Sequence, residues 1–367
     1  MRILVAMSGG VDSSVVACLL QKQGHEVIGV RFQLWQDPLA PALAKVLPTK
    51  CCDTQTLARA RKVTSNLGIP LHTLDLQDSF KCTVVDPFIR ATRRGITPNP
   101  CVLCNRAFKF KHLLTFARKL KCDKVATGHY ARIVRRGNGF ALLEAQDATK
   151  DQSYFLARLT QKELARTVLP LGTKTKRETY ALAKKFKIPL DHVSYRESQD
   201  LCFFPEKSPA AFLRRSITAA KPGPIKTLDG TVVGTHEGLP FYTIGQRRGL
   251  KVGGQKTPLH IIRIDQKSNT IFLAPSRALL TKEVYVNTLT FTREKPAQRR
   301  CHPLTARIRL QTRKGRGTFT FRGYTGLFRF SRPVSAPTPG QALVLYRGQE
   351  IIGCGQIISA ESQKRTS

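Results

Sequence analysis

The fold of this chain is decided by one stretch near its start, Ile3-Leu4-Val5-Ala6-Met7-Ser8-Gly9-Gly10-Val11-Asp12-Ser13-Ser14. Its first four residues are apolar and predict a short buried strand. The two glycines allow a tight turn. Apolar residues at helical spacing then predict a helix from Asp12 to Gln23, which Gly24 ends. A strand followed by a helix in this way is typical of an α/β domain.

The turn between this strand and this helix predicts a phosphate-binding site. Backbone amides at a helix N-terminus point outward, where the helix dipole favours negative charge, and Ser8, Ser13 and Ser14 add hydroxyl donors. Asp12 is placed either to hold Mg²⁺ against phosphate oxygens or to cap the helix. The Gly-Lys-Ser/Thr ending of the Walker loop is missing. The string instead resembles the pyrophosphate loop of the ATP-pyrophosphatase superfamily, whose members split ATP and adenylate an oxygen.

Strand and helix signals go on alternating through the first half of the chain. The further strands expected are Val27–Phe32, Leu71–Leu76 and Lys124–Thr127, and the further helices are Asp53–Leu67 and Arg106–Leu120. Strands that alternate with helices predict a doubly wound, mostly parallel sheet.

The pattern changes at Pro222, where Gly and Pro become frequent and strand signals dominate. Hairpins are expected at Asp229-Gly230 and between Ile264 and Phe272. Closely spaced strands then predict a C-terminal β-barrel: Ala306–Gln311, Thr318–Phe321, Leu327–Phe330, Ala342–Tyr346 and Ile351–Ile358. We therefore expect three domains: a catalytic domain over 1–205, a small central bridging domain over 206–284, and a barrel that contacts the substrate over 285–367.

The composition indicates a polyanionic partner. The 367 residues include 61 Lys and Arg against 24 Asp and Glu, a net charge of +37. A folded cationic surface favours nucleic acid, although charge alone does not separate RNA from DNA or a membrane. No apolar run is long enough to span a membrane and no signal peptide is evident, so we expect a cytoplasmic protein. Ten cysteines are too few for a disulfide scaffold, so closely spaced ones favour catalysis or metal binding.

Two such cysteines, Cys101 and Cys104, lie in Gly95-Ile96-Thr97-Pro98-Asn99-Pro100-Cys101-Val102-Leu103-Cys104-Asn105-Arg106. Two prolines predict a rigid extended turn before a helix. Cys104 is then expected near the helix N-terminus and close to Arg106, and both features lower a thiol pKa. A further cysteine, Cys202, precedes Phe203 and Phe204.

With these segments the chain resembles the bacterial tRNA-specific 2-thiouridylases. Four further segments agree, in order along nearly the whole chain: Ala126–Tyr130, Lys150–Leu156, Tyr242–Leu250 and Thr338–Gln341. The resemblance implies 2-thiolation of the wobble uridine in the tRNA anticodon, by adenylation of the C2 oxygen and attack by a cysteine persulfide. It also implies ATP and Mg²⁺ as cofactors and a protein that donates sulfur, and we expect a monomer.

The resemblance assigns roles to individual residues. It implies that Cys202 carries the persulfide, and that Cys104 helps to release the sulfur and ends in a disulfide with Cys202. The implied ATP-binding residues are Ala6, Met7, Ser8, Gly9, Gly10, Val11, Asp12, Ser13, Phe32 and Gly128. The implied contacts with tRNA or the target base are Asn99, Pro100, Cys101, His129, Lys150, Asp151, Gln152, Arg309, Leu310 and Gln341.

Two positions depart from the family pattern. Leu310 stands where relatives often have Tyr, and Cys101 stands where many relatives have an aspartate expected to assist proton transfer. A thiol has a much higher pKa than a carboxyl group and is no simple replacement. Cys101, Cys104 and Cys202 are candidate ligands of an iron-sulfur cluster; the alternative is thiol chemistry without a cluster, with Cys101 auxiliary or incidental.

Two other functions are compatible with parts of the sequence. Another adenylating enzyme of the same superfamily that acts on tRNA would keep the loop without needing Cys104 and Cys202. A non-catalytic RNA-binding protein would need only the charge and the barrel.

Overall fold

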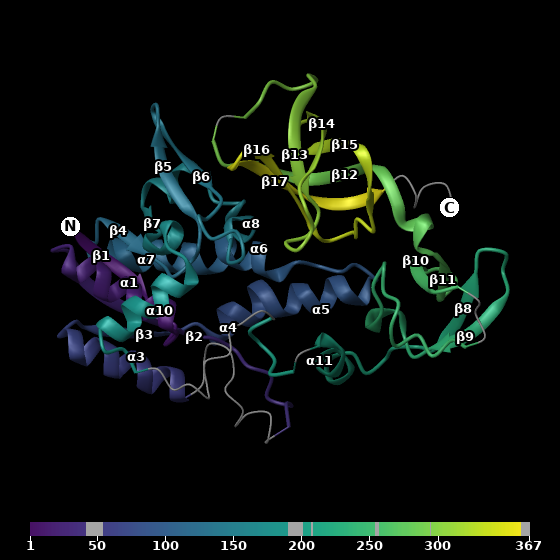
Figure 1. Ribbon diagram of the computed structural model, residues 1–367. Helices are drawn as coiled ribbons and strands as arrows, with labels where there is room; N and C mark the ends of the chain where they lie inside the picture. Colours follow the sequence, from purple (N-terminus) through teal and green to yellow (C-terminus); the bar gives the residue numbers. More distant parts are fainter. Residues whose placement is uncertain (42–53, 190–200, 207, 254–256, 294, 361–367) are drawn as a thin grey trace. The chain divides into compact units, whose positions relative to one another are not determined.

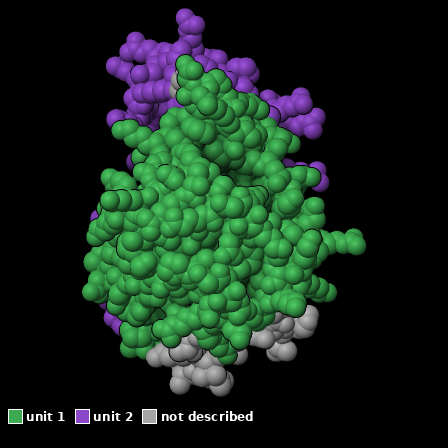
Figure 2. Space-filling model, turned by 90° about the vertical axis from the view of Figure 1, so that its left-hand side faces the viewer, with its two compact units in different colours: residues 1–85, 100–212, 349–351 green, residues 86–99, 213–348, 352–367 purple. Residues whose placement is uncertain are grey.

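The computed structural model describes residues 1–41, 54–189, 201–206, 208–253, 257–293 and 295–360 (Figure 1). The chain divides into two compact units, coloured in Figure 2: unit 1 comprises Met1–Val85, Pro100–Phe212 and Gln349–Ile351, and unit 2 comprises Asp86–Asn99, Leu213–Gly348 and Ile352–Ser367. The expected helix start at Asp53 lies outside the described residues. Among the described helices, none is both long and apolar enough to cross a membrane.

Unit 1 is built on a five-stranded sheet in the order β3-β2-β1-β4-β7. Every neighbouring pair in it is parallel, so the predicted doubly wound sheet is confirmed. Its strands are β1 (Arg2–Ala6), β2 (Glu26–Gln33), β3 (Leu71–Asp75), β4 (Lys124–Ala126) and β7 (Thr167–Val168).

Helices cover both faces of this sheet. Ile3 and Val5 of β1 pack into one cluster with residues of α1 (Val11–Lys22), α3 (Thr54–Leu67) and α10 (Lys176–Lys185). Leu4 points the other way, into a cluster with Leu113 and Ala117 of α7 (Lys111–Lys119). The alternation along β1 therefore separates the two layers, as expected of a strand buried on both faces.

The helical segment that carries Cys104 begins earlier than predicted. It runs without a break through α6 (Pro100–Cys104), the π-helical η2 (Asn105–Phe110) and α7. The predicted start at Arg106 is therefore wrong by six residues. The reason is that proline has a helical φ and its missing N–H costs nothing in the first helical turn.

The remaining elements of unit 1 are short. They are α4 (Gln77–Phe80), η1 (Lys81–Val85), the hairpin of β5 (Arg132–Arg136) and β6 (Gly139–Leu143), α8 (Ser153–Leu156), α9 (Gln161–Ala165) and η3 (Pro170–Thr173). Helix α11 (Pro209–Ser216) continues from unit 1 into unit 2.

Unit 2 contains α5 (Asp86–Arg93) and a four-stranded sheet in the order β10-β11-β8-β9. Strands β8 (Gly223–Thr227) and β9 (Val232–His236) form the hairpin predicted at Asp229-Gly230. Strands β10 (Leu259–Asp265) and β11 (Thr270–Pro275) form the second predicted hairpin. Two single turns, η4 (Leu239–Phe241) and η5 (Ser276–Leu279), complete this part.

The other part of unit 2 is the predicted β-barrel, built from six strands. They are β12 (Leu280–Phe291), β13 (His302–Arg307), β14 (Gly315–Arg322), β15 (Thr325–Ser335), β16 (Ala342–Arg347) and β17 (Glu350–Ala360). The barrel closes because β12 pairs with both β15 and β17, around a core that includes Phe319, Phe328 and Phe330. Strand β12 runs through residues 284 and 285, where the start of the barrel domain was expected, and β13 ends at Arg307, earlier than the predicted Gln311.

Candidate active site

The phosphate loop lies where β1 ends and α1 begins, at the carboxyl edge of the parallel sheet. The strand order reverses between β1 and β4, and open α/β sheets bind ligands outside their carboxyl ends at such a reversal. Gly9 has a φ of +76°, and a Cβ built on it would lie 2.1 Å from the carbonyl oxygen of Thr56. Only glycine fits there, because its backbone lies directly against α3.

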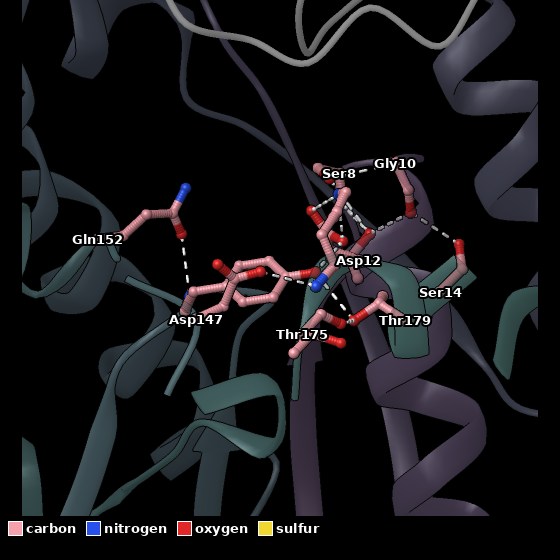
Figure 3. A network of polar contacts seen from close by, with 11 residues as sticks. Ser8, Gly10, Asp12, Ser14, Asp147, Gln152, Thr175 and Thr179 are labelled. Carbon is pink, nitrogen blue, oxygen red and sulfur yellow. Dashed lines mark hydrogen bonds and ion pairs between the residues drawn. The ribbon is translucent and has the colours of Figure 1, made fainter. Parts of the chain in front are cut away.

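Hydroxyl groups inside the loop fix its shape (Figure 3). Ser13 Oγ donates to the carbonyl oxygen of Gly10 at 3.0 Å and accepts from the Ser8 amide at 3.2 Å. Ser14 Oγ donates to the same carbonyl at 3.0 Å. Gly10 is the N-cap of α1, and no side chain among the described residues caps that helix. The first amides of an α-helix have no acceptor within the helix, so this end is suited to an anion.

Asp12 does not cap the helix. Its carboxylate accepts two bonds from Lys176 Nζ, at 2.8 Å and 2.9 Å. Its Oδ1 also accepts from the Tyr130 hydroxyl at 2.9 Å, and that hydroxyl is 2.9 Å from Thr179 Oγ1. Of the two sequence-based alternatives for Asp12, capping is therefore excluded in this conformation.

The other implied ATP-binding residues adjoin the loop or lie at the same sheet edge. A Cβ built on Gly128 would lie 3.0 Å from Asp12 Cβ and 3.1 Å from the Ser13 amide nitrogen, so the segment after β4 packs directly on the loop. Phe32 lies near the end of β2, the neighbour of β1, and its ring centroid is 6.4 Å from that of Phe108 in η2.

His129 links this loop region to the cysteine helix. It follows Gly128, and its ring stacks on Phe110 of η2 with centroids 6.2 Å apart at an angle of 26°. Its Nδ1 is 2.8 Å from Thr127 Oγ1. Burial, together with the smaller effect of the Lys109 charge, lowers the pKa of His129 to about 3. A neutral imidazole of this kind would contact RNA by stacking or hydrogen bonding and not through charge.

Cys104 is buried and is the fifth residue of its helix, so it lies beyond the first turn. Arg106 Nε is 3.8 Å from Glu163, so that carboxylate shares the guanidinium charge that we expected to activate the thiol. Asn105, also buried, donates to the carbonyl oxygens of Cys101 at 3.1 Å and Phe155 at 3.3 Å. This buried amide ties the cysteine helix to the Lys150–Leu156 segment.

Cys202 is half-buried and precedes the buried Phe203. The Phe203 ring contacts Phe204 and Phe212 edge-on, and these two rings stack on each other. None of Cys101, Cys104 and Cys202 forms a disulfide in this structure. Within the described part of the chain, no group of three or more His, Cys, Asp or Glu side chains is arranged to hold a metal ion. These three cysteines are described and form no such group, so the residues present do not fit an iron-sulfur cluster in this conformation.

Of the three implied tRNA contacts at 150–152, Asp151 and Gln152 have side chains that bond within the protein. Asp151 is 8% exposed, and its carboxylate accepts from the amides of Ala145 and Ser153 and from the Ser153 hydroxyl. Gln152 Oε1 accepts from the Tyr130 amide at 3.0 Å. These two side chains hold the segment together, whereas Lys150 is half-exposed.

Of the remaining implied contacts, Pro100 and Cys101 belong to unit 1, and the others lie in unit 2, where three of the segments that carry the resemblance meet: Asn99, Arg309, Leu310 and Gln341. Gln341 Nε2 donates to the carbonyl oxygens of Thr97 at 2.9 Å and Pro98 at 3.3 Å, and Asn99 Nδ2 is 3.4 Å from Gln341 Oε1. Thr97 Oγ1 donates to Thr243 Oγ1 at 3.3 Å. The residues that lead into Cys101 are therefore fixed by the barrel turn that contains Gln341.

The guanidinium of Arg309 also forms hydrogen bonds within unit 2. It donates to the carbonyl oxygen of Ala336 at 2.9 Å and to the hydroxyl of Thr338. Leu310 beside it is half-exposed. Sequence reasoning assigned no role to Asn105, Tyr130, Lys176 or Thr179, although Asn105 and Tyr130 lie in segments that carry the resemblance. For Lys176 and Thr179 the local signal was Thr175 followed by Glu178, a capping box that marks the start of α10.

Comparison with known proteins gives matches along the whole chain. Family models described as "tRNA methyl transferase HUP domain", "tRNA methyl transferase PRC-barrel domain" and "Aminomethyltransferase beta-barrel domain" match residues 1–206, 210–275 and 281–357. A Chloroflexus aurantiacus protein named tRNA-specific 2-thiouridylase MnmA is 43% identical over 98% of this chain and 99% of its own length. A Geobacter metallireducens protein of the same name is 40% identical over 99% and 98%.

Similarity to solved structures is slight. A 4-thiouridine synthetase–RNA complex with bound ATP shares 18% identity over 59% of this chain and 50% of that one, with a TM-score of 0.36. A score this low carries no argument about the site.

Proposed function

The chain belongs to the tRNA-specific 2-thiouridylase family, and from that premise we propose that it replaces the C2 oxygen of the wobble uridine in tRNA with sulfur at the expense of ATP. The family models carry the word methyl transferase in their descriptions. The relatives that match over the full length of both chains are named as thiouridylases, and the cysteines suit sulfur transfer.

One observation supports the proposal above the others. The Thr127–His129 segment adjoins both halves of the required chemistry: Gly128 packs on Asp12 and Ser13 of the phosphate loop, and His129 stacks on Phe110, in the helix of Cys104. An adenylating loop and a thiol on adjoining elements are what transfer of sulfur to an activated base requires.

In the first step ATP adenylates the uracil C2 oxygen and releases pyrophosphate, whose charge the amides at the start of α1 would stabilise. Asp12 is the carboxylate at the loop and fits one Mg²⁺ ligand, because this ion commonly takes one or two carboxylates together with substrate phosphates. When bound, the ion would neutralise phosphate charge. The base reaches ATP more easily from a single-stranded anticodon loop, where little stacking is lost.

In the second step the terminal sulfur of a persulfide on Cys202 attacks C2, and AMP leaves with the former C2 oxygen. Cys104 as a thiolate then attacks the Cys202 sulfur bound to the transferred sulfur. The S–S bond breaks, its electron pair stays on the product sulfur, and Cys104 and Cys202 become a disulfide. A thiol reductant restores both cysteines, and a sulfur-donor protein reloads Cys202.

The test uses the fraction of the protein that elutes as a monomer in gel filtration. This fraction is incubated with ATP, Mg²⁺, a persulfide donor and tRNA, and the nucleosides of the tRNA are then analysed by mass spectrometry. We expect 2-thiouridine; a methylated uridine in its place would identify methyl transfer. Cys104→Ser and Cys202→Ser should each abolish the product, whereas Cys82→Ser, at an exposed cysteine of η1, should not.

The same assay separates the two rivals. Release of pyrophosphate with tRNA but without a thiolated base would indicate another adenylating enzyme. Binding of tRNA without pyrophosphate release would indicate a non-catalytic RNA-binding protein. Full activity in either the Cys104 or the Cys202 variant would refute the assignment of that cysteine.

A further inference from the structure

Lys176 is placed at the phosphate loop by a helix distant in sequence. It is the first residue of α10, whose N-cap Thr175 forms a capping box with Glu178. The Lys176 amide donates to Asp147 Oδ2 at 3.0 Å. The start of α10 is thus fixed by three side-chain contacts, and the Lys176 side chain extends from it to Asp12, 164 residues earlier in the chain.

The ammonium group of Lys176 is confined on several sides. The side chain is only 14% exposed, which is unusual for lysine. Its Nζ lies 5.6 Å and 5.2 Å from the ring centroids of Tyr130 and Tyr180. Attraction between a cation and an aromatic face is stronger where water is partly excluded. The charge is therefore held at a definite place beside the loop.

The carboxylate of Asp12, which pairs with Lys176, would by itself oppose phosphate binding by the loop. Asp12 is the second residue of α1, and a carboxylate at that place repels an incoming phosphate. Lys176 neutralises it with two short bonds, and the Tyr130 hydroxyl orients it. A lysine ammonium on a flexible four-carbon stem can exchange one anionic oxygen for another nearby without moving its helix.

We propose that Lys176 binds the β- and γ-phosphates of ATP and the pyrophosphate they become, with Asp12 holding the ammonium at the loop before nucleotide arrives. The assignment rests on the proposed function only in requiring that the loop binds ATP. It adds a residue of α10 to an ATP site for which the sequence motifs name only residues 6–13, Phe32 and Gly128.

The test compares Lys176→Met with Lys185→Met, which removes the same charge from an exposed position on the same helix. Equilibrium binding of a non-hydrolysable ATP analogue, of pyrophosphate and of AMP is measured by calorimetry. A charge-assisted bond lost from Lys176 should weaken binding of the analogue and of pyrophosphate by about ten- to hundredfold. Binding of AMP, which lacks both phosphates, should be unchanged, and Lys185→Met should bind all three like the wild type.

Two results would overturn the proposal. Wild-type affinity for the ATP analogue in Lys176→Met would show that the lysine does not touch the phosphates. An equal loss for AMP would show that the substitution merely collapses the loop. If the wild type itself bound no ATP analogue, the proposed function would fail instead, so the two failures are distinguishable.

A second variant covers the possibility that Lys176→Met does not fold. Lys176→Arg keeps the positive charge and should bind the analogue more tightly than Lys176→Met is expected to, because a guanidinium also bonds phosphate oxygens. If Lys176→Arg lost as much affinity for the analogue and for pyrophosphate as we expect for Lys176→Met, the result would contradict a role for the positive charge. Thermal unfolding of each variant shows how much of any change comes from stability.

Discussion

Replacing Gly9 with alanine tests whether the phosphate loop depends on the close approach of its backbone to α3. An L-residue at a φ of +76° costs about 1–2 kcal/mol. The added Cβ would lie 2.1 Å from the Thr56 carbonyl oxygen, and because Cβ atoms do not approach such atoms within 3.0 Å, the loop or α3 must move by about 0.9 Å. Overpacking of this kind costs about 1–3 kcal/mol more.

Gly24→Ala is the matched control, since Gly24 has a φ of +78° and open space around the Cβ position. It should lose only the conformational part, about 1–2 kcal/mol in urea unfolding, whereas Gly9→Ala should lose about 2–5 kcal/mol. A misplacement near 1 Å can cost about a hundredfold in activity, so pyrophosphate release should fall by about that factor in Gly9→Ala alone. Equal destabilisation of the two variants, or normal activity in Gly9→Ala, would refute this reasoning.

Four further outcomes can be checked. His129 stays neutral down to about pH 3 in the folded protein but takes up a proton near pH 6.5 when unfolded, so its contribution to stability is present above pH 6.5 and is lost as the pH falls. Below pH 6.5 the free energy of unfolding should therefore drop more steeply than in His129→Asn, by up to about 1.4 kcal/mol per pH unit. Parallel curves of unfolding free energy against pH for the two proteins would contradict this. Asp151→Ala should destabilise by about 1–3 kcal/mol because the buried amides of Ala145 and Ser153 lose their acceptor. Lys150→Met should keep stability and bind tRNA more weakly; the reverse pattern would make Asp151 the RNA contact. Gln341→Leu should speed amide exchange at Thr97 and Asn99 and slow thiolation, and unchanged exchange would show that Gln341 does not hold these residues in place. Anaerobically purified protein should thiolate tRNA without bound iron or sulfide, and stoichiometric iron would restore the cluster hypothesis for Cys101, Cys104 and Cys202.

Much of the fold is determined by local sequence. Alternating apolar segments, the Gly9-Gly10 turn and Gly-rich hairpins predict the parallel sheet and most of the barrel, because side-chain period and turn chemistry act over a few residues. Strand β12 was missed, since its pairing with β15 and β17 includes register shifts that interrupt simple alternation.

The candidate site divides in the same way. The sequence by itself determines the phosphate loop, the spacing of Cys101 and Cys104, and the family, because these depend on short motifs. Only the tertiary structure decides that Lys176 lies on Asp12 and that Gln341 holds Thr97, contacts that span 164 and 244 residues. It also decides that Asp151 and Arg309 bond inside the protein. A buried polar atom must find a partner wherever the fold brings one, and that partner leaves no periodic signal in the chain.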